Sequence, residues 1–226
     1  MDNKLTKDLI LTKAHAFAAE EDTVEIVEET QDRIIYLVES GADVYERMYR
    51  FSEQINKKLV KDMMLADNKV RECMDISRLS KFIAEEIDIN ALIVCDRIAL
   101  IWDDNEGHSD VRDELELIHS DEYAQYVAED MCGTTWVERQ VVVINVREIA
   151  AVCDAMNLTC DDFARGVIST LLHEFRHLLY ECNEMIEFGE EYPADGGGED
   201  EVEWYGNCMA EQTAGRYEDI FLKMPN

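Results

Sequence analysis

Hydrophobic residues recur at helical spacing through the first 88 residues of the chain. In residues 24–38, 43–65 and 76–87, apolar side chains return every three or four positions, which is typical of amphipathic helices. Both prolines, Pro193 and Pro225, lie outside these segments, so no proline interrupts them. The pattern predicts an N-terminal helical region over residues 1–88.

From Ile89 the hydrophobic pattern changes. Residues 89–96 and 97–102 are short runs rich in β-branched and aliphatic residues, which favour strands, whereas residues 110–130 return to helical spacing. Residues 137–149 (VERQVVVINVREI) contain the clearest strand of the chain, and a short helix around 150–157 follows it. The pattern therefore predicts a predominantly helical α+β fold, with a second region over residues 89–226 that is either separate or part of one compact unit.

The next segment predicts a long helix that carries the most informative motif. Thr159 followed by Asp162 is a typical N-terminal capping pair. Beyond it, an apolar stripe runs for about five helical turns, and it consists of Phe163, Val167, Ile168, Leu171, Leu172, Phe175, Leu178 and Leu179. The sequence HEFRH, residues 173–177, lies beside this stripe.

Two histidines four residues apart share one face of a helix, so the imidazoles of His173 and His177 can converge on one ion. Zinc binds neutral imidazole nitrogen, and a catalytic zinc keeps one position for water, whose pKa it lowers. Glu174 then becomes the candidate base that removes the proton of this water. The alternative is a pair of hydrogen-bonded histidines on a helix flank.

A catalytic zinc site needs a third protein ligand. No histidine follows His177, so we expect a carboxylate, and Glu203 in the sequence EWYGNCMA is the first candidate. Gly206 keeps the approach to the metal open, and Asn207 is placed to hydrogen-bond a ligand histidine. The competing ligands are the neighbouring acids and two cysteines without a partner at zinc-finger spacing: Glu199, Glu201, Glu211, Cys182 and Cys208.

These two motifs resemble those of the zincin metallopeptidases, specifically the gluzincin branch and, within it, the ImmA/IrrE type. In that group the second glutamate is followed by Ala, Asn, an apolar residue and Ala; here Glu203 is followed by Gly206, Asn207, Met209 and Ala210. The resemblance covers roughly residues 135–215, and it departs from the family at Gly206 and in the acidity of the segment between the motifs.

The resemblance implies a zincin-like core with a small mixed sheet, zinc as cofactor, and selective hydrolysis of a protein or peptide. It also implies a strand before the motif helix that borders the substrate cleft. Val141–Val146 is placed to be this edge strand, although an ordinary buried strand explains its residues equally well. A second electrophile should stabilise the oxyanion, and its candidates are Tyr192, Tyr205, Tyr217 and Arg216.

The net charge of −30 disfavours direct binding to nucleic acid and to anionic membranes, and it favours basic peptide or protein partners. No apolar run is long enough to span a bilayer, and no signal-peptide core follows the N-terminus. Seven cysteines without a CxxC pair favour reduced thiols, so we expect a cytoplasmic protein. Two further functions stay open: a non-catalytic zinc-binding regulator of the same fold, and an acidic interaction protein that mimics nucleic acid.

Overall fold

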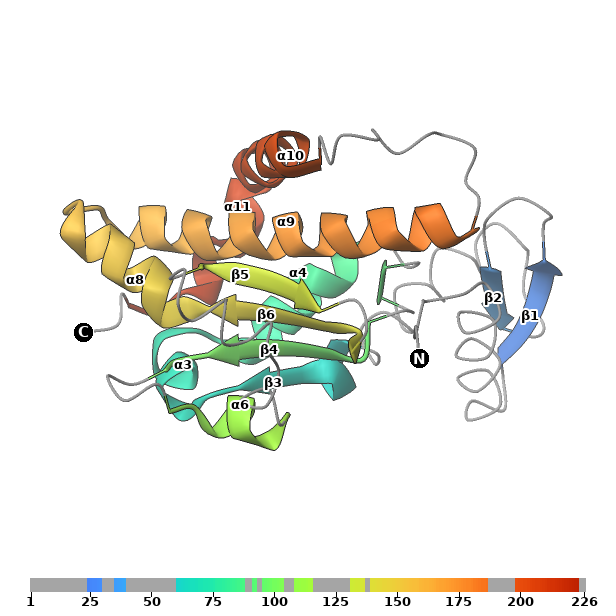
Figure 1. The fold of residues 1–226 in the computed structure, drawn as a ribbon, viewed down its shortest axis with the longest axis horizontal. Coiled ribbons are helices and arrows are strands. Elements are labelled where there is room, and N and C mark those ends of the chain that lie inside the picture. Colours follow the sequence, from blue (N-terminus) through green and yellow to red (C-terminus); the bar gives the residue numbers. More distant parts are fainter. Residues whose placement is uncertain are drawn as a thin grey trace.

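The protein has an α+β architecture in which helices cover a small mixed sheet (Figure 1). The computed structural model describes residues 24–29, 35–39, 60–87, 91–92, 95–103, 108–115, 131–136, 139–186 and 198–223. The helices are α3 (Asn68–Cys73), α4 (Ile76–Glu86), α6 (Asp110–Glu114), α8 (Val146–Ala155), α9 (Cys160–Ile186), α10 (Gly198–Gln212) and α11 (Ala214–Tyr217), and the last is followed by the 3-10 turn η3 (Glu218–Ile220). No helix within these ranges is both long and apolar enough to cross a bilayer.

The main sheet has four strands in the order β3-β4-β6-β5. They are β3 (Met64–Ala66), β4 (Arg97–Ile101), β6 (Val141–Asn145) and β5 (Gly133–Trp136). The first three are parallel, whereas β5 pairs antiparallel with β6. A strand between two neighbours and under helices is buried on both faces, which explains the uninterrupted apolar run of β6.

The edge strand of the sheet is therefore β5. Of the two interpretations of Val141–Val146, the structure gives the buried one: β6 is central, and Val146 already begins α8. The strand β5 was not predicted from the sequence, because its four residues, GTTW, are too few to show a period.

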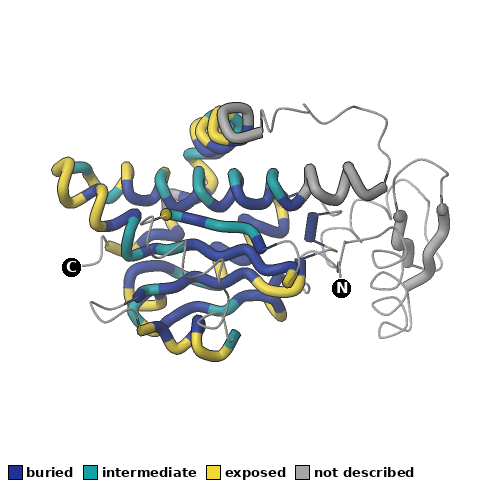
Figure 2. The backbone as a smooth tube through the Cα atoms, in the orientation of Figure 1, coloured by how far each residue is buried: buried dark blue, intermediate teal, exposed yellow. Residues whose placement is uncertain are grey.

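Helix α9 lies along β5 and β6, and α10 packs on α9 on the side away from the sheet (Figure 1). The predicted capping pair is confirmed at its start, where the Asp162 N–H donates to Thr159 Oγ1 (3.2 Å) and Asp162 Oδ2 accepts from Thr159 N–H (2.9 Å). These hydrogen bonds hold the pKa of Asp162 below its usual value. The inner face of α9 is buried (Figure 2), as its apolar stripe predicts.

Residues 60–87 pack in the same core as the motif helix. Val70, Leu79 and Ile83 belong to one buried cluster with Phe163 and other residues of α9. Strand β3 also joins the main sheet through β4. The end of the predicted N-terminal region thus contributes directly to the layer that supports α9.

The helix predicted over residues 24–38 is wrong. This segment contains β1 (Val24–Glu29) and β2 (Ile35–Glu39), which pair antiparallel with Val24 opposite Glu39. Both strands are rich in β-branched and aromatic residues, whose strand preference here overrides a helix-like spacing. The predicted α4 is confirmed, whereas the helix over 43–65 lies outside the described residues up to 59 and ends before β3.

Predictions for the second half are mostly confirmed where the structure describes them. The strand over 97–102 corresponds to β4, the start of the helix over 110–130 corresponds to α6, and the helices around 150–157 and beyond 201 correspond to α8 and α10. The strand over 89–96 is wrong at residues 91–92, which are helical. Residues 116–130 and 187–197 lie outside the described ranges.

Candidate active site

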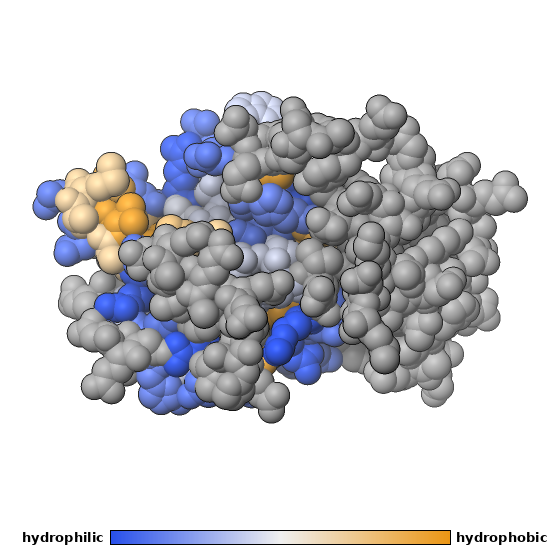
Figure 3. All heavy atoms as spheres, in the orientation of Figure 1, coloured by the Kyte–Doolittle hydropathy of each residue, from blue (hydrophilic) through white to orange (hydrophobic). Residues whose placement is uncertain are grey.

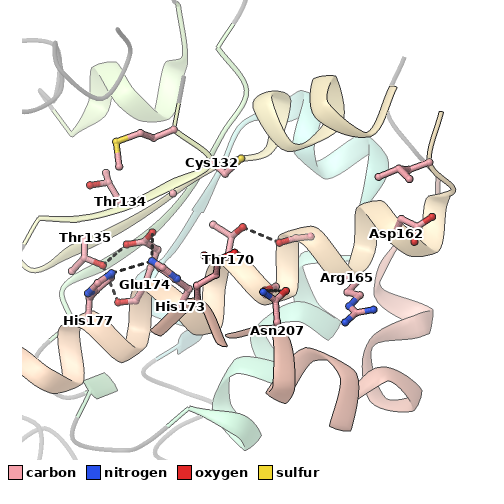
Figure 4. A pocket seen from close by; sticks show the side chains of 16 residues that line it. Cys132, Thr134, Thr135, Asp162, Arg165, Thr170, His173, Glu174, His177 and Asn207 are labelled. Atoms are coloured by element: carbon pink, nitrogen blue, oxygen red, sulfur yellow. Dashed lines mark hydrogen bonds and ion pairs between the residues drawn. The ribbon is translucent and has the colours of Figure 1, made fainter. Parts of the chain in front are cut away.

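His173 and His177 lie one turn apart on α9, and the Nε2 atoms of their rings face each other (Figure 4). Their Nε2 atoms are 3.0 Å apart, and the ring centroids are 4.7 Å apart in an edge-to-face arrangement. Two nitrogens that each bind a tetrahedral zinc at the usual bond length lie about 3.3 Å from one another. The observed 3.0 Å is close to this value and also fits a hydrogen bond between the two rings, so both interpretations of the histidine pair stay open.

Glu174 is buried beside this pair, with 5% of its surface exposed. Its Oε1 lies 4.0 Å from His173 Nε2, and its Oε2 is 2.8 Å from the hydroxyl of Thr135 on β5. The same hydroxyl is 2.9 Å from the main-chain oxygen of Glu174, so its single proton can be donated to either oxygen. Thr135 is thus within hydrogen-bond distance of both the backbone and the carboxylate of the candidate base, and it can donate to one of them at a time.

Gly133 allows β5 to approach α9 this closely. A Cβ atom at this position would lie 2.6 Å from Thr170 Cγ2 and 2.7 Å from Glu174 Oε1. Both distances are shorter than real Cβ contacts, so any other residue here would displace the strand or the Glu174 carboxylate. Neither Gly133 nor Thr135 was predicted, because each contact joins residues far apart in the sequence.

Helix α10 approaches the other side of α9 through Gly206. A Cβ atom there would lie 2.7 Å from the main-chain oxygen of Ser169 and 3.2 Å from His173 Cβ. The neighbouring Asn207 Oδ1 accepts a hydrogen bond from Ser169 Oγ at 3.0 Å. Asn207 therefore links α10 to α9 through Ser169. Its expected hydrogen bond to a ligand histidine stays a prediction.

Glu203 lines the same pocket as His173, Glu174 and His177, and it is exposed. Among the residues that the structure describes, no three His, Cys, Asp or Glu side chains form a group that could hold a metal ion. The structure thus brings the two histidines and Glu174 together and places Glu203 on the wall of the pocket, outside such a group.

The alternative metal ligands predicted from the sequence do not replace Glu203. Glu211 is exposed and is not among the described residues that line the pocket, and Cys208 accepts a hydrogen bond from Gln212. The side chains of Glu199, Glu201 and Cys182 lie outside the described part of the structure. No predicted alternative among the described side chains thus takes the place of Glu203.

The pocket has a volume of about 750 Å³ and lies between β5, α9 and α10. Five consecutive residues, 131–135, line it. Since successive side chains of a strand point to opposite faces, such a run indicates that the edge of β5 borders the pocket. Along α9 the pocket continues from the histidines past Asn207 to Arg165 and Asp162 (Figure 4).

The candidate oxyanion residues lie elsewhere. The Tyr217 hydroxyl is buried and donates to the Ala210 carbonyl at 3.0 Å, and Arg216 pairs with Glu85 and Glu86 of α4. The Tyr205 ring packs under the Arg176 guanidinium at 4.8 Å. None of these candidates lines the pocket, so their prediction as oxyanion donors is not supported. Tyr192 lies outside the described residues.

A half-buried thiol also lines the pocket. Burial raises the pKa of Cys132, and the negative charges of Glu148 and Glu174 act in the same direction. At neutral pH this thiol is therefore protonated and a poor ligand or nucleophile.

On the face drawn in Figure 3, most of the described surface is hydrophilic. A small apolar patch lies at the end of the molecule where α8 meets α9, with Val152 and Met156 exposed there. This patch lies near the N-terminal end of α9, and Val152 and Met156 do not line the pocket.

No family model, no curated protein and no solved structure matches this chain. The likeness to the zincins consequently rests on the two sequence motifs alone.

Proposed function

We propose that the chain is a zinc-dependent peptidase, with zinc held by His173, His177 and Glu203. The observation that carries the proposal is the 3.0 Å spacing of the two Nε2 atoms beside a buried glutamate that a strand hydroxyl holds in place. A mixed sheet with an antiparallel edge strand next to the motif helix supports a zincin-like core.

Zinc would supply a Lewis acid and a water of lowered pKa at this point. His173 and His177 present neutral imidazole nitrogens to it, and Glu203 adds a carboxylate from α10. Glu174 accepts the proton of the attacking water on its carboxylate and delivers it to the leaving amide nitrogen. Thr135 keeps this carboxylate pointed into the pocket between the two steps.

The edge of β5 supports an extended peptide as the substrate. An extended peptide can add to the open edge of a sheet through main-chain hydrogen bonds, which recognise any unfolded segment. Here that edge borders the pocket and leads past Glu174. The net charge of −30 favours peptides that are basic overall. Free thiols in the core, such as Cys73 and Cys153, suit a reducing compartment such as the cytoplasm.

The test combines zinc content with peptide cleavage. We expect about one zinc per chain in the parent protein and its loss in His173→Ala and Glu203→Ala. A peptide mixture prepared from a digested proteome, read by mass spectrometry, should be cleaved by the parent and not by Glu174→Gln, which retains zinc. A parent that holds no zinc after reconstitution, or a zinc-loaded parent that leaves every peptide intact, would refute the peptidase.

One observation favours the second candidate, a zinc-binding protein without catalysis. Within the described residues no third ligand is grouped with the histidine pair, so Glu203 must move for the site to close. If Glu174→Gln supports every function of the parent in its native cell, the site regulates or stabilises rather than cleaves.

A further inference from the structure

The pocket carries a single strong cation at its far end. Among the described residues that line it, Arg165 is the only Lys or Arg, in a chain of net charge −30 (Figure 4). The other charged groups on the wall are the carboxylates of Asp162, Glu174 and Glu203. Away from the zinc of the proposed site, Arg165 is the group in this described lining that would attract a substrate carboxylate, whereas the three acidic side chains would repel it.

Asp162, which lies three residues before Arg165 and also lines the pocket, makes its hydrogen bonds to Thr159. Asp162 Oδ2 already accepts from the Thr159 main-chain N–H at 2.9 Å and from its hydroxyl at 2.7 Å, in the capping pair that begins α9. Arg165 adds a smaller, purely electrostatic contribution to the lowered pKa of Asp162. The guanidinium is exposed and keeps donors for a planar, two-oxygen partner such as a carboxylate.

The contacts of β5 fix which end of a bound peptide reaches Arg165. Gly133 lies against Thr170, and Thr135 lies against Glu174, so β5 and α9 run in the same direction along the pocket. Antiparallel pairing is the more stable arrangement at a sheet edge. A peptide paired in this way runs against β5, and its C-terminal part points toward Arg165.

The spacing along α9 gives the position of the carboxylate. Arg165 precedes His173 by eight residues, which is about 12 Å along a helix axis. An extended peptide advances by about 3.3 Å per residue. About 12 Å corresponds to roughly 3.6 extended residues, so Arg165 lies level with the third to fifth substrate residue after the cleaved bond.

We infer that Arg165 forms a subsite for a substrate carboxylate on roughly the third to fifth residue after the cleaved bond, and this rests on the proposed peptidase function. The carboxylate comes from an Asp or Glu side chain or from the C-terminus of a short peptide. The acidic surface attracts a basic substrate as a whole, and Arg165 selects one acidic group within it.

The experiment compares cleavage by the zinc-loaded parent, Arg165→Gln, Arg165→Glu and the control Arg78→Gln. Arg78 is an exposed residue of α4 that does not line the pocket, so its variant removes the same charge elsewhere. All four proteins are given the proteome-derived peptide mixture, once with free and once with amidated C-termini, and the residues around each cut are read by mass spectrometry. The affinity of Glu174→Gln for the best cleaved peptide, with and without Arg165→Gln, gives a readout independent of turnover.

We expect the parent and Arg78→Gln to prefer a carboxylate at these positions by about fivefold, the value of an exposed ion pair near 1 kcal/mol. Arg165→Gln loses the preference, and Arg165→Glu reverses it toward Lys and Arg. Loss on amidation alone identifies the C-terminus as the source. Cleavage by the parent with an unchanged profile in Arg165→Gln, or a preference on the N-terminal side of the cut, overturns the inference and leaves the peptidase intact. Absence of cleavage by the zinc-loaded parent overturns both.

Discussion

Gly206 gives the sharpest test of how α10 is placed against the motif helix. The zincins that the chain resembles carry alanine at this position, and in a helix interior alanine is more stable than glycine by about 1 kcal/mol. The structure argues for the opposite sign. A Cβ atom at Gly206 would lie 2.7 Å from the Ser169 main-chain oxygen, whereas ordinary contacts begin at 3.4 Å.

The difference of 0.7 Å between these two distances must be absorbed by the backbone. Ser169 belongs to the interior of α9, so its carbonyl cannot rotate away, and the whole of α10 must shift. Overpacking of this kind costs about 1–3 kcal/mol, against the gain in helix propensity of about 1 kcal/mol. We therefore expect Gly206→Ala to lower the free energy of unfolding by up to about 2 kcal/mol.

Gly215 provides the matched control. It lies in α11, and a Cβ atom there would meet nothing within 4 Å. Gly215→Ala should raise the free energy of unfolding by about 0.4–1 kcal/mol, mainly by restricting the unfolded chain. Urea unfolding of both variants in the presence of a chelator measures the difference without the contribution of bound metal. A Gly206→Ala protein that is as stable as Gly215→Ala would show that α10 does not pack on α9 as described.

Three further predictions concern Thr135 on β5, Asp67 directly after β3 and Cys132 directly before β5. Thr135→Val should lower kcat by about 10- to 100-fold with KM and zinc content unchanged, because one hydrogen bond to a buried carboxylate is lost; Thr135→Ser should restore it, and failure of the serine variant would contradict a positioning role. Asp67→Asn should lower the free energy of unfolding by about 3 kcal/mol, because the buried carboxylate accepts hydrogen bonds from Trp102 N–H, the Ser109 hydroxyl and Val111 N–H. Urea unfolding measures this change, and a loss below about 1 kcal/mol would mean that these hydrogen bonds are not formed. Cys132, whose pKa is raised, should react with iodoacetamide more slowly at pH 7.5 than a free thiol and faster as the pH rises; mass spectrometry of the alkylated peptide measures this, and a reaction as fast as that of free cysteine would place the thiol in solvent.

The motif helix could be predicted from the sequence because all of its signals are local. The cap joins Thr159 to a residue three positions on, and the apolar stripe and the histidine pair follow one helical period. Each of these signals lies within a few residues and needs no contact with a distant segment to be recognised. The same reasoning failed at residues 24–38, where a run of valine, isoleucine and glutamate fits a helix and a strand alike, and only pairing with a second strand decides between them.

The rest of the site depends on contacts between distant segments, which the spacing of hydrophobic residues along the sequence does not predict. Thr135 meets Glu174 across 39 residues, and Asn207 meets Ser169 across 38. A threonine in a short strand looks like an ordinary strand residue until its partner is known. The glutamate that was expected to complete the metal site is a similar case, because its position depends on how α10 settles on α9.

Two glycines allow β5 and α10 to pack closely on α9. Gly133 admits β5 against Glu174 from one side of α9, and Gly206 admits α10 against His173 from the other. In both cases the missing side chain allows a backbone to approach the motif. The hydroxyl of Thr135 then reaches Glu174, the candidate base, and Glu203 lies on the pocket wall. A glycine where the zincins carry alanine is thus a structural requirement of this chain, in which the distance between two helices sets the position of the candidate third ligand.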